Sequence, residues 1–94
     1  EIINDNTYKI KTLDDNSLII DCGSKFDFHI DLEDAKNIFK DSQLNDNNKI
    51  YIIDNYDNIT YIISKKNNDL FLDLYKGNDI NKIHFIHSLG STEI

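Results

Sequence analysis

The sequence predicts an α+β domain that is predominantly antiparallel β, with elements in the order βββ-α-ββββ. Short runs rich in Ile, Tyr and Phe recur about every ten residues between clusters of Asp, Asn, Gly and Ser, as in strands joined by turns. A single segment in the first half instead repeats its apolar residues at helical spacing. Since 94 residues suffice for one hydrophobic core, we assign residues 1–94 to a single domain.

The first part of the chain predicts strands at residues 7–13, 17–22 and 25–30. The third alternates most regularly, with Phe26, Phe28 and Ile30 on one face and polar residues on the other. A three-residue loop, Cys22-Gly23-Ser24, aligns the apolar faces of the second and third strands. We therefore expect an antiparallel hairpin in which Gly23 has a positive φ.

A helix is predicted over residues 32–43. Asp31 precedes it as N-cap, and Asp34 follows three residues later, where the helix dipole favours a negative charge. Its apolar stripe consists of Leu32, Ala35, Ile38 and Phe39.

Four more strands are predicted at residues 49–54, 59–65, 70–76 and 82–88. The middle two have the clearest register. A two-residue Asn67-Asn68 turn pairs Lys66 with Asp69, Ile63 with Leu72, and Tyr61 with Leu74.

These later strands are apolar on both faces. One face contains Ile50, Ile52, Ile63, Leu72 and Leu74, and the other contains Tyr51, Ile53, Ile62, Phe71, Tyr75 and Ile86. Both faces need cover, and one short helix covers only part of one face. We therefore predict a small roll or partly closed barrel with the helix packed on the sheet. The alternative is a homodimer or a partner covering the second face, with an interface at Tyr51, Phe71, Tyr75 and Ile86.

The net charge of −7, with ten Lys and no Arg, argues against direct binding of nucleic acid or an anionic membrane. Seven acidic residues against Lys25 place −6 of this charge between residues 14 and 34. This acidic patch, a candidate surface for a protein partner with a basic surface, comprises Asp14, Asp15, Asp21, Asp27, Asp31, Glu33 and Asp34. A solvated face that keeps a β-rich domain soluble explains the same charges.

One group of histidine and acidic residues has the spacing of a possible metal site on a strand. Asp27, His29 and Asp31 share one face of a predicted strand, which suits a metal ion or a general base. No second cluster is placed to complete such a site, so we interpret these residues as a solvent-exposed face. His84 and His87 are three residues apart, which on a regular strand places them on opposite faces.

Cys22 is the only cysteine, and Asp21 offsets the nearby positive charge of Lys25. We interpret it as a buried structural residue. The Asp/Asn clusters lack the spacing of a calcium loop and are explained by turn formation. We therefore assign no catalytic, metal or cofactor-binding residue, and expect no enzyme activity.

Val, Pro, Met, Trp and Arg are absent, while Ile, Asn, Lys and Asp dominate, which suggests an A/T-rich coding sequence. No apolar run approaches the length of a membrane span, and we expect a cytoplasmic protein of a bacterial or host cell. The expected function is non-enzymatic protein binding, as a small acidic inhibitor, immunity or anti-defence factor that blocks a basic surface of a nucleic-acid-handling protein. The alternative is a structural or assembly module, either a fragment of a larger chain or a homo-oligomer.

Overall fold

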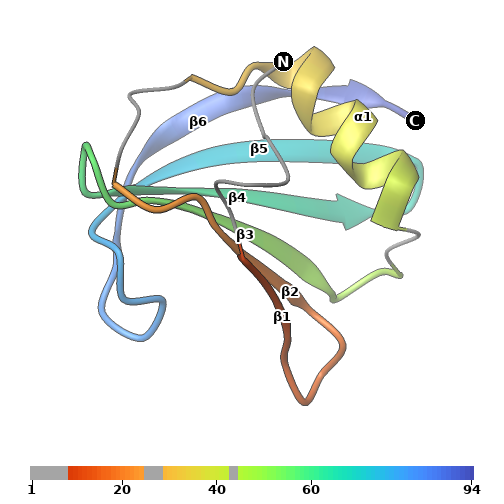
Figure 1. Cartoon of the computed structure of the whole chain (residues 1–94). Coiled ribbons are helices and arrows are strands. Elements are labelled where there is room, and N and C mark those ends of the chain that lie inside the picture. Colours follow the sequence, from red (N-terminus) through yellow and green to blue (C-terminus); the bar gives the residue numbers. More distant parts are fainter. Residues whose placement is uncertain (1–8, 25–28, 43–44) are drawn as a thin grey trace.

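The computed structural model describes residues 9–24, 29–42 and 45–94. They form six strands and one helix, with the helix between the second and third strands (Figure 1). The elements are β1 (Lys9–Thr12), β2 (Leu18–Asp21), α1 (Leu32–Ser42), β3 (Lys49–Asp54), β4 (Ile59–Lys66), β5 (Asp69–Lys76) and β6 (His84–Glu93). The prediction of an α+β fold rich in antiparallel strands is confirmed.

The strands form one sheet in the order β1-β2-β3-β4-β5-β6. All neighbouring pairs are antiparallel except β2 and β3, which are parallel. The prediction of a roll or partly closed barrel is wrong, because β1 and β6 lie at opposite edges of this open sheet. A parallel pair requires a crossover connection, and the segment that contains α1 supplies it.

The predicted hairpin between residues 17–22 and 25–30 is also wrong, because both edges of β2 are paired with other strands. Each residue of β2 pairs with β1 on one side and with β3 on the other. Residues 25–28 lie outside the described part of the chain, and His29 and Ile30 are not in a strand. Alternation shows which side chains share a face, but it does not identify the neighbouring strand.

Gly23 does have the predicted positive φ, at 73°. Its amide donates to Asp21 Oδ1 at 2.9 Å, and the amide of Cys22 donates to the Ile53 carbonyl at 3.0 Å. Gly23 therefore lies where the chain leaves the parallel β2–β3 pair.

The hairpin of β4 and β5 has the predicted register. Lys66 pairs with Asp69, Ile63 with Leu72, and Tyr61 with Leu74. Asn67 has a φ of 57° in the turn, a conformation that Asn tolerates better than most residues. The turn and the strand pattern agree here because the paired residues are close in sequence.

The start of α1 is capped as the sequence predicts. The Asp34 amide donates to Asp31 Oδ1 at 2.9 Å, and the Asp31 amide donates to Asp34 Oδ2 at 3.1 Å. The helix then packs across β5 and β6 (Figure 1). A Cβ atom on Gly90 in β6 would lie 2.8 Å from Leu32 Cδ1, so glycine permits the close approach of the helix start.

The main core lies on the helix side of the sheet. Ile50, Ile52, Ile63, Leu70 and Leu72 have no exposed surface. The core also includes two residues of the predicted helical stripe, Ala35 and Phe39. Burial of each such large side chain contributes roughly 1.5–3 kcal/mol. The Cα radius of gyration is 12.2 Å, and no helix of the described residues is long and apolar enough to cross a membrane.

Candidate functional site

The acidic patch predicted from the sequence is divided in the structure. Asp14 and Asp15 lie in the β1–β2 turn, whereas Asp31, Glu33 and Asp34 lie at the start of α1. The turn and the helix start are at opposite ends of the view in Figure 1, with the sheet between them. Of the two remaining members, Asp21 is the last residue of β2. Asp27 lies outside the described residues.

Several carboxylates of this set accept hydrogen bonds from the nearby backbone. Asp15 Oδ1 accepts from the Ser17 amide at 2.9 Å, and this bond is the main cause of the lowered pKa of Asp15. Asp21 Oδ1 accepts from Gly23 N and Asn55 Nδ2, both at 2.9 Å. The pKa of Asp31 is lowered chiefly by the amide of Asp34. These acids therefore stabilise turns and the helix start, whatever else they bind.

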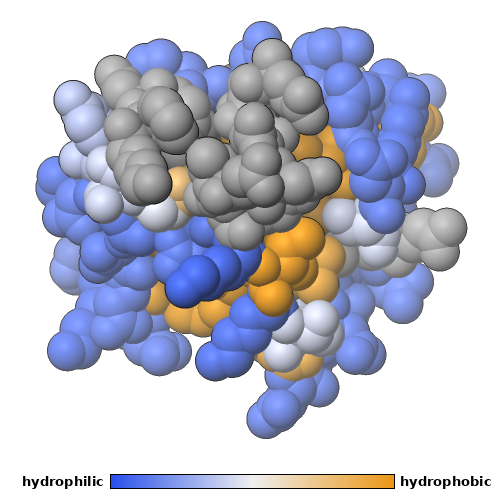
Figure 2. Space-filling view, in the orientation of Figure 1, coloured by the Kyte–Doolittle hydropathy of each residue, from blue (hydrophilic) through white to orange (hydrophobic). Residues whose placement is uncertain are grey.

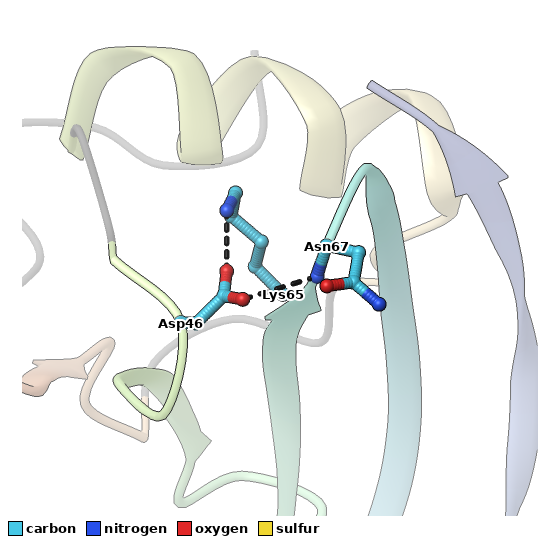
Figure 3. Close-up of polar contacts among 3 residues, drawn as sticks. All are labelled: Asp46, Lys65 and Asn67. Atoms are coloured by element: carbon cyan, nitrogen blue, oxygen red, sulfur yellow. Dashed lines mark hydrogen bonds and ion pairs between the residues drawn. The ribbon is translucent and has the colours of Figure 1, made fainter.

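Asp46 connects two turns in the same way (Figure 3). Its carboxylate forms an ion pair with Lys65 and accepts from the Asn67 amide at 3.2 Å. The pKa of Asp46 is lowered, first by the bond from Lys65 and then by the bond from Asn67. The turn before β3 is thereby joined to the β4–β5 hairpin.

Asp54 and Cys22 are buried polar groups near the start of the β3–β4 turn. Asp54 Oδ1 accepts from the amides of Tyr56 and Asp57 at 2.9 and 3.2 Å, while Oδ2 has no hydrogen-bond partner among the described residues. Burial, followed by the charges of Asp21 and Asp54, raises the pKa of Cys22 to about 12. The interpretation of Cys22 as a buried cysteine is confirmed, and its thiol is protonated near neutral pH.

The structure changes the predicted placement of two histidines. His84 pairs with Lys76 and His87 with Leu74, so both lie on the helix-side face of β6. The prediction of opposite faces is wrong because a β-bulge at Ile86 adds one unpaired residue between them. No group of three or more His, Cys, Asp or Glu side chains that could hold a metal ion occurs in the described ranges.

The face of the sheet opposite α1 is the second candidate surface, which we call the open face. Strand pairing places its residues in two rows that cross the sheet from β1 to β6. The first row is Lys9, Asp21, Ile53, Thr60, Tyr75 and Phe85, and the second is Lys11, Ile19, Tyr51, Ile62, Asp73 and Ser88. Phe71 lies next to Asp73 along β5, on the same face.

Aromatic side chains cover the middle of the open face. Thr60, Ile62 and Ile53 have exposed fractions of 0, 5 and 7%, although the helix is on the other side. The rings of Tyr75 and Phe85 meet edge to face, with centroids 5.6 Å apart. The pKa of Tyr51 is raised, first by burial and then by Asp15 and Tyr75. Large residues of the sheet itself thus shield the smaller ones between them.

The predicted interface residues have different positions here. Tyr51, Phe71 and Tyr75 lie on the open face and are half-buried, whereas Ile86 is exposed in the β-bulge without a cross-strand partner. Sequence reasoning missed Phe85, which pairs with Tyr75 and is 59% exposed. The β-bulge hides its position, because strict alternation along β6 does not predict the true register.

The helix side also leaves hydrophobic surface uncovered. Figure 2 shows hydrophobic residues near the middle of this side, with hydrophilic ones beside and below them. Ile10, whose register partner Ile20 belongs to the core, is itself 59% exposed. Since α1 packs on β5 and β6, it does not extend over β1.

No protein-family model matches this chain, and no curated protein or solved structure is significantly similar to it. The function is therefore inferred from its surfaces.

Proposed function

We propose that this chain is a non-enzymatic protein-binding domain that acts as a small acidic inhibitor, immunity or anti-defence factor. Its partner is a nucleic-acid-handling protein whose basic surface it covers. The observation that supports this proposal is the net charge of −7, together with exposed acids at two places on the surface. These exposed acids are Asp14 and Asp15 in the β1–β2 turn and Asp31 and Glu33 at the start of α1.

Negative charge at two separated places favours a partner with an extended basic surface. The acids attract such a partner over a distance of about one Debye length, roughly 8 Å at physiological salt. This attraction raises the association rate and weakens as salt is added. The helix dipole, positive at the start of α1, reduces the field of the acids there.

Asp14 and Glu33 are the best residues for a test, because they accept none of the capping or turn bonds described above. Asp14→Lys combined with Glu33→Lys changes the net charge by four without removing a cap. Asp41→Lys combined with Asp69→Lys is the matched control, since both residues are exposed and the change in charge is the same.

The three proteins serve as baits in lysate from the source cell. Partners retained by the control but lost with Asp14→Lys/Glu33→Lys are then purified, and their affinity is measured at increasing salt. We expect the test variant to bind at least about tenfold more weakly and to show a flatter salt dependence. Equal affinity of both variants for every captured protein would overturn the proposal.

A second candidate function is that of an assembly module, in which the open face binds a copy of this chain or another part of a larger protein. Its support is the aromatic surface formed by Tyr51, Tyr75 and the 59%-exposed Phe85. Aromatic residues are enriched in protein interfaces, where they contribute much of the binding energy.

A further inference from the structure

The open face has opposite charges on its two halves. Its strand residues from β1 to β3 include three lysines and one aspartate, namely Lys9, Lys11, Lys49 and Asp21. Those from β4 to β6 include one lysine and three acids, namely Lys66, Asp69, Asp73 and Glu93. Asp21 accepts hydrogen bonds from Gly23 and Asn55, and Lys66 is the register partner of Asp69 across the β4–β5 hairpin. The strand charges of the open face therefore sum to +2 on the β1–β3 half and −2 on the β4–β6 half, and Asp15 of the β1–β2 turn interacts with Lys49 of the positive half.

Aromatic residues lie in the middle of the open face, among these charged residues. Tyr51 belongs to β3, and Phe71 and Tyr75 belong to β5, on either side of the buried Ile62 in β4. An aromatic centre with charged residues around it is the usual arrangement of a protein interface. A face that has both charge signs on opposite sides of such a centre is complementary to itself.

A two-fold axis provides the matching geometry. When the axis runs parallel to the strands, between β3 and β4, it lays the β1–β3 half of one copy over the β4–β6 half of the other. Sheets packed in this way are about 10 Å apart, which long side chains can bridge. This axis places β1 of one copy over β6 of the other, so each Lys11 lies opposite Ser88 of the second copy. Asp73 is in the same row, one strand to the side, which is within reach of the long lysine side chain.

The edges of the sheet are less suited to self-association. Strand β1 has four residues, two of them lysines, and β6 is interrupted by two register shifts. Short strands, edge lysines and β-bulges all disfavour strand addition. A second copy is therefore better placed on the face than at an edge.

We propose that two copies of this chain pack their open faces together, with Lys11 of each copy beside Asp73 of the other. This inference rests on the second candidate function, that of an assembly module, and specifies its partner and its register. In such a dimer, Phe85 and Tyr51 are removed from water in both copies.

The test uses two charge reversals, Lys11→Glu and Asp73→Lys, each examined alone and then mixed in equal amounts. Each reversal alone places like charges together twice in the homodimer. In the mixed dimer, the two introduced charges are opposite in sign and face each other, and the unchanged Lys11 faces the unchanged Asp73, so both contacts are restored. Sedimentation equilibrium at low salt measures the dimer dissociation constant, and circular dichroism verifies that each variant is folded.

We expect each reversal to raise the dissociation constant by about tenfold and the mixture to regain most of the unmodified affinity. Lys40→Glu and Asp41→Lys are matched controls, since they make the same changes in net charge at exposed positions of α1. They should leave the dissociation constant within about threefold of the unmodified value, as expected for charges remote from an interface.

The possible outcomes separate this inference from the function on which it rests. If the unmodified protein stays monomeric up to its solubility limit, the proposed dimer is overturned. The assembly-module function is not, because the open face can still bind another chain, which a separate binding experiment measures. A dimer that resists both reversals, or that the mixture fails to restore, overturns the Lys11–Asp73 register but keeps self-assembly. The dimer dissociation constant of Phe85→Ser then shows whether the open face forms the interface. This substitution removes an exposed ring from the open face without changing the net charge.

Discussion

The two faces of the sheet are buried in different ways. On the helix side, Ile63 is fully buried in the cluster that contains residues of α1. On the open face, its neighbour Ile62 is almost as buried, with 5% of its surface exposed, although α1 packs on the other side and the register partners of Ile62 are Tyr51 and Asp73. Similar burial therefore arises from packing between layers on one side and from crowding within one layer on the other. The exposed fraction of a residue does not by itself show which face is the core.

The largest expected effect compares these two isoleucines. Ile63→Ala should lower the free energy of unfolding by about 2–5 kcal/mol, because the helix and sheet that surround the cavity relax only partly. Ile62→Ala should cost clearly less, since the partly exposed aromatic side chains around it can settle into the space. Urea denaturation of both variants measures the difference. Equal losses would show that the open face is packed as tightly as the core.

A second substitution tests how closely the helix approaches the sheet. Gly90 has a φ of 129°, and a Cβ atom there meets Leu32 of α1. Gly90→Ala should lower the free energy of unfolding by about 1–3 kcal/mol, because alanine is strained at this φ. Ser91→Ala, at the next and exposed position on the open face, should change it by less than about 0.5 kcal/mol. A neutral Gly90→Ala variant would show that the backbone at this position relaxes to a φ suited to alanine and that the Leu32 side chain turns aside without cost.

A smaller effect is expected at the helix cap. Asp31→Ala removes the acceptor for the Asp34 amide, and should destabilise the protein less than Gly90→Ala does. Because the pKa of Asp31 is lowered in the folded protein, this stabilisation is present above the pKa of the unfolded carboxyl, about 4. It is lost as the pH falls through the folded-state pKa. Thermal unfolding between neutral and acidic pH should therefore show a shallower dependence for Asp31→Ala than for Glu33→Gln.

The last prediction concerns the thiol of Cys22, which follows β2 and affects stability only at high pH. With its pKa raised to about 12, it should react with a disulfide reagent at pH 8 far more slowly than in the urea-unfolded chain. The protein should also lose stability as the pH rises from about 9 to about 12, since only the unfolded chain ionises there. Cys22→Ser, followed over the same pH range, separates this contribution from that of the tyrosines. Rapid native labelling would contradict the burial of this residue.

The regions that were predicted well are those whose partners are close in sequence. The Asn67-Asn68 turn and the alternation around it define the β4–β5 register, and Asp31 with Asp34 defines the start of the helix. The β2 partner and the placement of His87 could not be obtained in this way. The first depends on a crossover between residues about thirty apart, and the second on a β-bulge that alternation cannot reveal.

The candidate surfaces show the same division. Concentration of acids between residues 14 and 34 is visible in the sequence, but the fold sends the β1–β2 turn and the start of α1 to separate places (Figure 1). Tyr51, Phe71 and Tyr75 were correctly grouped on one face because each lies on a regular strand. Phe85 joins them only through the register of β6.

The sequence by itself determined the helix and its cap, the segments of β3, β4 and β5, the β4–β5 register and the net charge. Each depends on backbone preferences, alternation or composition, which act over a few residues. Only the tertiary structure decided that β2 and β3 are parallel, that the sheet stays open, and which charges share a face. Those features depend on which distant strands pair and on where the helix packs, and pairings of this kind leave no periodic signal in the chain.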